Sequence, residues 1–211
     1  HSGFESGSDN VLKLINKGST LQNEIDGGVK AKKAGVELSV YFMPGIGGKE
    51  YSEENASETA KAINIISPDF VRLRTFVLKK ESELYPMELN REFTSCTDRE
   101  KLKEIRELVA EVYAPDVNIV SDHIVNLIGS LNGKIGTDKE AMLDMADRVL
   151  ELPEQEFRVY QLARRYGYIE NLSQLPSLPK AKLKHFRDIA EKYKDENMWE
   201  EHITDVLRQY V

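Results

Sequence analysis

Glu5 is the first side chain whose type and position could do chemistry. Phe4 is flanked by small residues, a pattern typical of a short strand that ends in a tight turn. Alternation along this strand puts His1, Gly3 and Glu5 on one face, so the carboxylate stands where a ligand can approach closely. Alternatively, Glu5 is solvated at the end of the strand or forms an ion pair with Lys17.

A glycine loop at 44–50 is the second such feature. Gly45, Gly47 and Gly48 would let the backbone come close to a ligand and point its amides at it. The loop matches neither the Walker phosphate-binding pattern nor the dinucleotide fingerprint. The alternative is a tight turn that uses glycine for steric reasons alone.

Two arginines lie on one face of the β-rich run 71–78. Arg72 and Arg74 alternate with apolar residues, and guanidinium groups inside a barrel need carboxylates or phosphates as partners. We expect Arg74, more than Arg72, to bind an anionic ligand group or Glu5. The alternative is an edge strand with both groups in water.

The segment 115–126 contains Asp122 and His123, which could serve a substrate or a proton relay. A structural histidine is the alternative. Cys96 is the only cysteine, so no disulfide forms within the chain and no set of thiolates can hold a cluster or metal. We expect Cys96 to be structural and predict no metal ligands.

Strands and helices alternate along the first part of the chain. The strand 36–43 would turn its aliphatic side chains to the surrounding helices, and Ser39 and Tyr41 to the lumen of a barrel. Such spacing favours parallel strands with right-handed crossovers. The predicted fold is therefore α/β: a partial (β/α) barrel followed by a helical C-terminal region. The elements and domains that we expect are strands near 1–5, 36–43 and 71–78, helices 19–35, 52–66 and 97–112, a loop 79–93 over the barrel mouth, and domains 1–95, 96–150 and 151–211.

The tail beyond 153 is predicted to be helical. Its basic residues, among them Arg158, Arg164 and Arg165, could meet a nucleic acid. Acidic residues nearly balance them, so a solvated face is the preferred interpretation.

Composition indicates an intracellular protein. The chain has 211 residues, 40% of them hydrophobic, enough to bury a sizeable core. A net charge of −7 argues against a general polyanion binder, so nucleic acid is not the expected partner. No apolar run is long enough to span a membrane and no signal peptide opens the chain, so we expect a cytoplasmic protein without membrane contact.

Three segments together resemble a known superfamily. The runs 3–12, 17–20 and 43–48 are similar to the middle of radical S-adenosylmethionine enzymes. The resemblance is to the branch of methylthiotransferases, oxygen-independent coproporphyrinogen dehydrogenase and the catalytic subunit of Elongator. It extends, with decreasing specificity, to about residue 150.

The resemblance implies roles for the residues above. Glu5, with Ser6 beside it, and Lys17 would contact S-adenosylmethionine, the glycine loop would lie under the adenine, and Arg74 would bind the methionyl carboxylate. The implied cofactor contacts are Glu5, Ser6, Lys17, Ser39, Tyr41, Gly45, Gly47, Gly48 and Arg74. The implied substrate contacts are Arg72, Asp122 and His123.

A four-iron four-sulfur cluster is also implied, held in the superfamily by three thiolates of a CxxxCxxC loop. Since only Cys96 is present, we expect the cluster ligands in a missing N-terminal half. That half, or another chain, would also cover an open sheet edge. The substrate is not specified. Alternatives are a non-catalytic α/β interaction module with a partner-docking helical tail, and a phosphate-binding α/β enzyme using the glycine loop.

Overall fold

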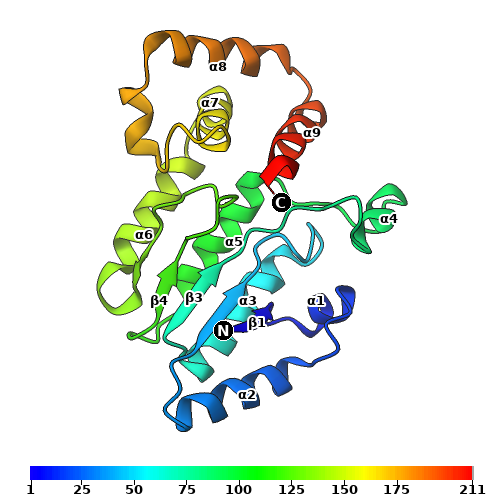
Figure 1. Ribbon diagram of the computed structural model, residues 1–211, viewed down its shortest axis with the longest axis vertical. Coiled ribbons are helices and arrows are strands. Elements are labelled where there is room, and N and C mark those ends of the chain that lie inside the picture. Colours follow the sequence, from blue (N-terminus) through cyan, green and yellow to red (C-terminus); the bar gives the residue numbers. More distant parts are fainter. Residues whose placement is uncertain (211) are drawn as a thin grey trace.

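Five short strands form one sheet at the centre of the computed structural model, which describes residues 1–210 (Figure 1). They are β1 (Ser2–Glu5), β2 (Ser39–Phe42), β3 (Phe70–Leu73), β4 (Asn118–Val120) and β5 (Gly133–Lys134). The strands β1 to β4 pair in sequence order and run parallel, whereas β5 is antiparallel to β4. Within the described residues β1 pairs only with β2, so the sheet is open at that edge.

Four helices cover one face of the sheet, namely α2 (Leu21–Lys33), α3 (Ser52–Ile66), α5 (Asp98–Glu111) and α6 (Ile135–Leu150). The short helices α1 (Asp9–Leu14) and α4 (Leu84–Leu89) contribute to a separate apolar cluster. Neighbouring parallel strands joined by right-handed crossovers place their helices on a common side, and α2, α3, α5 and α6 pack consecutively against one another. The predicted α/β class, a partial barrel with a helical C-terminal region, is confirmed.

Local capping signals start several of these helices. The Ser8 hydroxyl accepts from the amide of Val11 at 3.1 Å. Thr97 and Glu100 form a reciprocal capping box at the start of α5. Each such cap satisfies amides that have no partner inside the helix, which is worth about 1 kcal/mol.

The core lies between the sheet and these helices. On the sheet side it is formed by Phe4, Val40, Phe42, Val71, Leu73 and Ile119, none more than 2% exposed. Burying each such side chain contributes about 1.5–3 kcal/mol. Because side chains alternate along a strand, the neighbours of these residues point to the other, uncovered face.

Two strands are shorter than predicted. Val36 is 52% exposed and its amide bonds to Ala31 at the end of α2, so β2 begins only at Ser39. The strand β3 ends at Leu73. Beyond it, the amides of Arg74 and Phe76 still bond to the carbonyls of Phe42 and Pro44, whereas on the β4 side the amide of Thr75 bonds to the side chain of Asn126. The predicted loop 79–93 also contains the short helix α4.

The tail is helical as predicted. It consists of α7 (Glu154–Arg165), α8 (Lys180–Lys192), α9 (Glu196–Leu207) and the 3-10 turns η1 (Leu172–Ser177) and η2 (Arg208–Tyr210). Arg158, Arg164 and Arg165 are all buried, so the expectation that they form a solvated or nucleic-acid-binding face is wrong. No helix within residues 1–210 is long and apolar enough to cross a membrane.

A buried polar network joins the tail to the sheet layer. The carboxylate of Asp98, at the start of α5, lies 2.7 Å from the guanidinium of Arg165 and accepts a hydrogen bond from Gln161 at 3.1 Å. Gln161 in turn accepts from the indole of Trp199 at 2.9 Å. Burial disfavours the charged form of Asp98, but Arg165 outweighs it and the pKa of Asp98 is lowered. The network thus links α5, α7 and α9.

Replacing Arg165 by methionine should lower the free energy of unfolding by about 3–5 kcal/mol, because it leaves the Asp98 charge buried without its partner. Urea unfolding followed by circular dichroism measures the change. Arg148→Met is the matched control, since Arg148 pairs with Asp144 on the surface of α6, and should cost less than about 1 kcal/mol. Equal losses in the two variants would contradict this account of the network.

Candidate functional site

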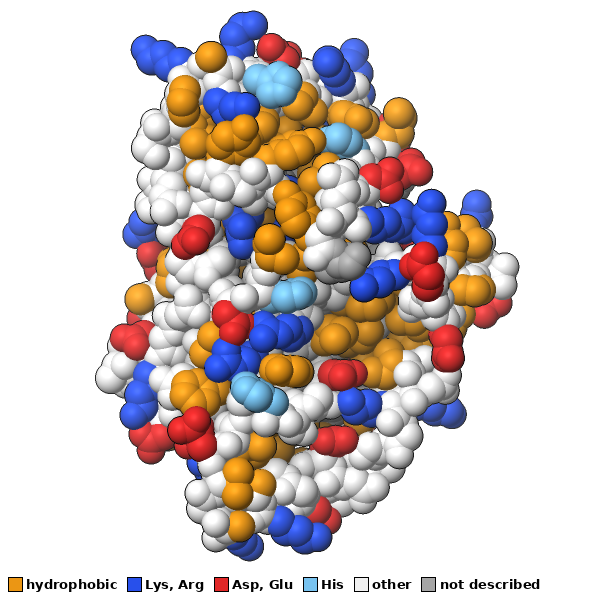
Figure 2. Space-filling view, viewed as in Figure 1, with side chains coloured by type: hydrophobic (Ala, Val, Ile, Leu, Met, Phe, Trp, Pro, Cys, Tyr) orange, Lys and Arg blue, Asp and Glu red, His pale blue; other side chains and the backbone are white. Residues whose placement is uncertain are grey.

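The uncovered face of the sheet carries the polar side chains that the sequence analysis singled out. Tyr41 from β2, Arg72 and Arg74 from β3 and its extension, and Asp122 beyond β4 lie on this side. Figure 2 views it and shows basic, acidic and histidine side chains gathered in front of the sheet. The site is therefore assembled at the carboxyl ends of adjacent parallel strands, where α/β proteins bind ligands.

Glu5 ends β1 in a left-handed conformation, with φ 67°. Its Oε1 lies 3.1 Å from Nζ of Lys17, and each side chain is about one quarter exposed. A Cβ on Gly3 would lie only 3.0 Å from that oxygen, so the missing side chain of Gly3 makes room for the pair. Phe4 points into the core, which places Glu5 and Lys17 on the uncovered face. The ion pair considered from the sequence is present, and a cofactor contact of these residues stays a prediction.

Ser6 follows Glu5 in the chain but is buried, whereas Glu5 is partly exposed. The hydroxyl of Ser6 accepts from the amide of Ser8 at 3.0 Å. Gly7, next to it, packs so closely on α3 that a Cβ would lie 2.5 Å from backbone atoms there. Ser6 thus has a structural role in the turn, and its contact with the cofactor stays a prediction.

The glycine loop packs closely against neighbouring segments of the protein, and its contact with the adenine stays a prediction. A Cβ on Gly45 or Gly48 would meet Lys101 at 2.9 Å or Phe93 at 2.7 Å. A Cβ on Gly47 would meet Val11 at 2.9 Å. The Gly45 amide, expected to point toward the adenine, donates to Glu104 at 3.0 Å. Close packing is therefore sufficient reason for all three glycines.

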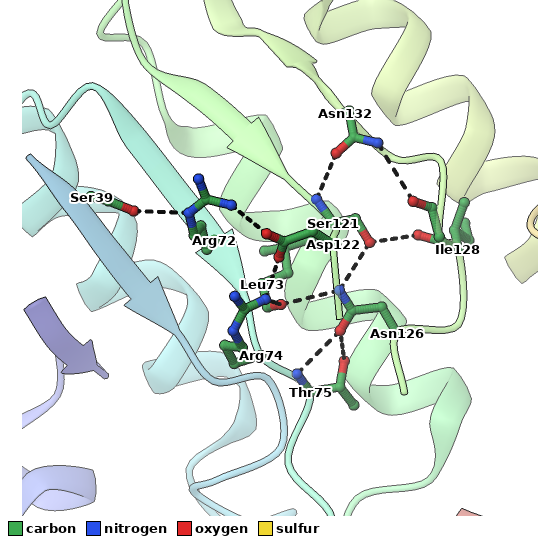
Figure 3. Close-up of polar contacts among 11 residues, drawn as sticks. Ser39, Arg72, Leu73, Arg74, Thr75, Ser121, Asp122, Asn126, Ile128 and Asn132 are labelled. Carbon is green, nitrogen blue, oxygen red and sulfur yellow. Dashed lines mark hydrogen bonds and ion pairs between the residues drawn. The ribbon is translucent and has the colours of Figure 1, made fainter. Parts of the chain in front are cut away.

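Asp122 is the partner of both arginines. It receives hydrogen bonds from Arg72 and Arg74, one on each carboxylate oxygen (Figure 3). Burial opposes ionisation of Asp122, but the two guanidinium groups outweigh it and lower the pKa of its carboxyl. Arg72 also donates to Ser39 at 3.2 Å, and Arg74 lies 5.0 Å from the ring centre of Tyr41. The two arginines were predicted to require an anionic partner, and within the described residues that partner is Asp122 rather than Glu5.

Asn126 holds this arrangement in place. Its amide oxygen accepts from the amide and hydroxyl of Thr75 at 3.2 and 2.8 Å. Its amide nitrogen donates to the Leu73 carbonyl at 3.1 Å and to Ser121 Oγ at 2.9 Å (Figure 3). Because Asn126 is buried and joins the end of β3 to the segment after β4, it fixes where Asp122 stands beside the arginines.

His123 is half-buried beside the arginines. Its Nδ1 is enclosed and has no hydrogen-bond partner among residues 1–210. Burial, together with the charge of Arg74, lowers the pKa of His123, so the ring is neutral at pH 7. A proton on the enclosed Nδ1 would be an unsatisfied donor, which places the proton of the neutral ring on Nε2.

A cleft of about 680 Å³ adjoins these residues. Residues from β2, the extension of β3 and the loop after it line the cleft, with His123 and Tyr210 from farther along the chain. The lining comprises Tyr41, Met43, Arg74, Thr75, Phe76, Val77, Lys79, Glu81, Ser82, His123 and Tyr210. Its volume is within the range of about 300–1,000 Å³ typical of small-molecule sites.

The sequence analysis missed Glu104, which is 1% exposed on α5. It accepts hydrogen bonds from the Gly45 amide, from Asn55 at 2.7 Å and from Ser52 at 2.7 Å. Burial nevertheless raises the pKa of Glu104 to about 7. An acidic residue one position before Ile105 of the apolar stripe was the only signal for it.

Cys96 packs beside Glu104 and is buried. Burial raises the pKa of its thiol to about 12, so it stays protonated. Within residues 1–210 no three His, Cys, Asp or Glu side chains form a group that could hold a metal ion. The described residues therefore do not fit an iron–sulfur cluster.

Comparison with known proteins finds similarity among solved structures alone. No protein-family model matches the sequence, and no curated protein matches it. Among solved structures, the archaeal Methanocaldococcus infernus Elp3 with an N-terminal deletion is similar over 56% of this chain, with 24% sequence identity and a TM-score of 0.49. The matched part spans 28% of that chain.

Asn126→Ala should lower the free energy of unfolding by more than about 2 kcal/mol, because it leaves the buried Thr75 amide and Leu73 carbonyl without partners. Asn10→Ala, which removes an exposed contact with Glu54, should change it by less than about 0.5 kcal/mol. Urea unfolding measures both. If the two variants cost the same, Asn126 does not hold the site together.

Glu104→Gln should remove part of the pH dependence of stability. Since the pKa of Glu104 is raised to about 7 in the fold, its contribution is present below the ordinary carboxyl pKa and is lost as the pH rises to about 7. The full loss is on the order of 3 kcal/mol. A glutamine can accept from Gly45 and donate to Ser52, so the packing is kept.

Urea unfolding of the wild type and of Glu104→Gln at pH 5, 6, 7 and 8 measures how the free energy of unfolding changes with pH. Glu140→Gln on the exposed side of α6 is the control. Glu200, whose pKa burial also raises to about 7, leaves a residual slope in every variant. A Glu104→Gln slope as steep as that of the control would show that Glu104 is ionised in the fold throughout.

Proposed function

We propose that this chain is the part of a radical S-adenosylmethionine enzyme that contacts the cofactor and the substrate. The observation that carries the proposal is the Glu5–Lys17 pair, which lies on the uncovered face of a parallel sheet at the positions that the resemblance assigns to the cofactor. The open edge of the sheet at β1 supports it, because a barrel needs further strands there.

The carboxylate of Glu5 would accept hydrogen bonds from hydroxyl or ammonium groups of S-adenosylmethionine, and the Lys17 ammonium would donate to its acceptors. Arg74 uses one terminal nitrogen for Asp122, which leaves the rest of its guanidinium for a carboxylate of cofactor or substrate. In this superfamily, reductive cleavage of S-adenosylmethionine at a four-iron four-sulfur cluster supplies a 5′-deoxyadenosyl radical that abstracts hydrogen from the substrate.

The cluster would come from outside the described residues, which offer no ligand set for it. We propose that an N-terminal half of the same protein, or another chain, provides the thiolates and pairs with β1. An unpaired parallel edge strand presents backbone groups that such a partner would satisfy. This piece alone would then be inactive.

The test is binding of S-adenosylmethionine to the full natural polypeptide that contains this sequence, measured by calorimetry. Glu5→Gln should weaken binding about tenfold or more, because a hydrogen bond to a charged group is worth about 1.5–3 kcal/mol. Glu140→Gln on the exposed side of α6 should bind as the wild type does. Unchanged affinity in Glu5→Gln would refute the assignment of Glu5.

The second candidate is a non-catalytic α/β interaction module whose helical tail docks a partner. It is favoured by the saturation of the site, since Lys17 pairs with Glu5, Asp122 with both arginines, and the glycine loop with α5. If this alternative is correct, the wild type does not bind S-adenosylmethionine, and substitution of Glu5 therefore changes no affinity for it.

A further inference from the structure

The cleft described above has a chemical bias that favours the substrate, one of the two ligands considered for Arg74. Arg74 and Lys79 line it against one carboxylate, Glu81, and Arg72 with Asp122 stands directly behind. Three cationic groups thus face two carboxylates there, in a chain whose net charge is −7. The local excess of positive charge favours an anionic ligand.

Arg74 and Lys79 have donors to offer. The hydrogen bonds of Arg74 within residues 1–210 use only its Nη1, which reaches Asp122 and the Leu73 carbonyl. Lys79 is exposed and makes no ion pair within the same residues. A guanidinium whose other side is already fixed by a carboxylate loses little freedom when it binds a second anion.

The remaining walls of the cleft are apolar and aromatic. Tyr41, Phe76 and Tyr210 line it together with Met43 and Val77. The Phe76 ring is held edge-on against Phe93, with ring centres 6.4 Å apart. Rings fixed in this way suit the face or edge of another ring.

Tyr210 brings the tail into the cleft. Its hydroxyl donates to the Arg165 carbonyl at 2.8 Å, and Arg208 donates to the Leu78 carbonyl at 3.2 Å. The first contact fixes η2 against the end of α7, and the second fixes it against the segment that follows β3. The tail therefore contributes one wall of a cleft whose other walls come from the sheet.

His123 supplies a directed hydrogen bond. It lines the cleft while its Nδ1 is enclosed, so the edge of the ring that carries Nε2 is the one within reach of a ligand. With the proton on Nε2, the ring is a donor suited to an oxygen acceptor. Several residues in the described part of the chain have an enclosed side-chain nitrogen or oxygen without a hydrogen-bond partner. Of these residues, only His123 lines the cleft.

We propose that this cleft binds the substrate, and that the substrate is a small aromatic acid. Arg74 and Lys79 bind its acid group, Nε2 of His123 donates to an oxygen, and the rings of Phe76 and Tyr210 enclose its ring. The proposal rests on the proposed function, to which it adds the chemical class of the substrate.

Calorimetry with three probes tests the class: phenyl phosphate carries ring and anion, inorganic phosphate only the anion, and phenol only the ring. Phenyl phosphate should bind the full polypeptide at least about tenfold more tightly than inorganic phosphate or phenol does, because each of these two probes lacks the contacts made by the other. Phenyl phosphate binding no tighter than inorganic phosphate would overturn the proposal.

Variants assign the contacts. Arg74→Gln should weaken phenyl phosphate about tenfold or more, and Arg74→Lys, which keeps the charge beside Asp122, should weaken it less. Tyr210→Ala should reduce the preference for phenyl phosphate over inorganic phosphate. The surface variant Arg148→Gln on α6 should leave every affinity unchanged. If Arg74→Gln and Tyr210→Ala both bind as the wild type does, the cleft is not the site.

S-adenosylmethionine separates this proposal from the proposed function. Phenyl phosphate should bind equally well to Glu5→Gln and should not be displaced by S-adenosylmethionine. Displacement would show that the cleft is the cofactor site and would overturn the substrate assignment alone. Binding of phenyl phosphate without any binding of S-adenosylmethionine would retain the aromatic-acid cleft and refute the radical enzyme.

Discussion

Asp122 pairs with both Arg72 and Arg74, and this shared carboxylate compensates two partly buried charges on one face of the sheet. The carboxylate comes from the segment after β4, which Asn126 joins to the end of β3. The side-chain amide of Asn126 bonds to the Thr75 amide and the Leu73 carbonyl, which face β4 beyond the end of the regular strand. Removing the carboxylate would leave two partly buried charges to repel each other.

The charged groups on the uncovered face of the sheet are paired with one another. Glu5 with Lys17, and Asp122 with its arginines, are pairs that persist without a ligand. A ligand must therefore compete with an existing contact or use the donors left over, as Arg74 permits. Such a site is preorganised, because ordering of its long side chains is complete before binding.

Much of the fold could be predicted because its signals are local. The alternation in Ser39–Phe42, the capping box of Thr97 and Glu100, and the proline at the start of α7 each act within a few residues. The contacts that could not be predicted join distant positions. The Asp98–Arg165 pair is an example, since the charge pattern of α7 is also that of a solvated helix face until Asp98 is known to lie beside it.

The candidate site divides in the same way. Which face Glu5, Tyr41 and Arg74 occupy follows from period-two alternation, and the sequence predicts it. The partners of these side chains could not be predicted from the sequence, because Asp122 and Asn126 contact β3 and its extension from about fifty residues along the chain. The glycine loop could not be interpreted from the sequence alone, because a ligand shelf and close packing against Lys101, Phe93 and Val11 both require glycine.

The polar network around Asp98 also provides a natural spectroscopic probe. Trp199 is the only tryptophan of the chain, and its fully buried indole is bonded to Gln161 where the tail meets α5. Its fluorescence emission should shift to the red when water reaches the indole, whether or not the distant strands have opened. Emission and backbone signals recorded together would therefore show whether the tail detaches before the sheet melts.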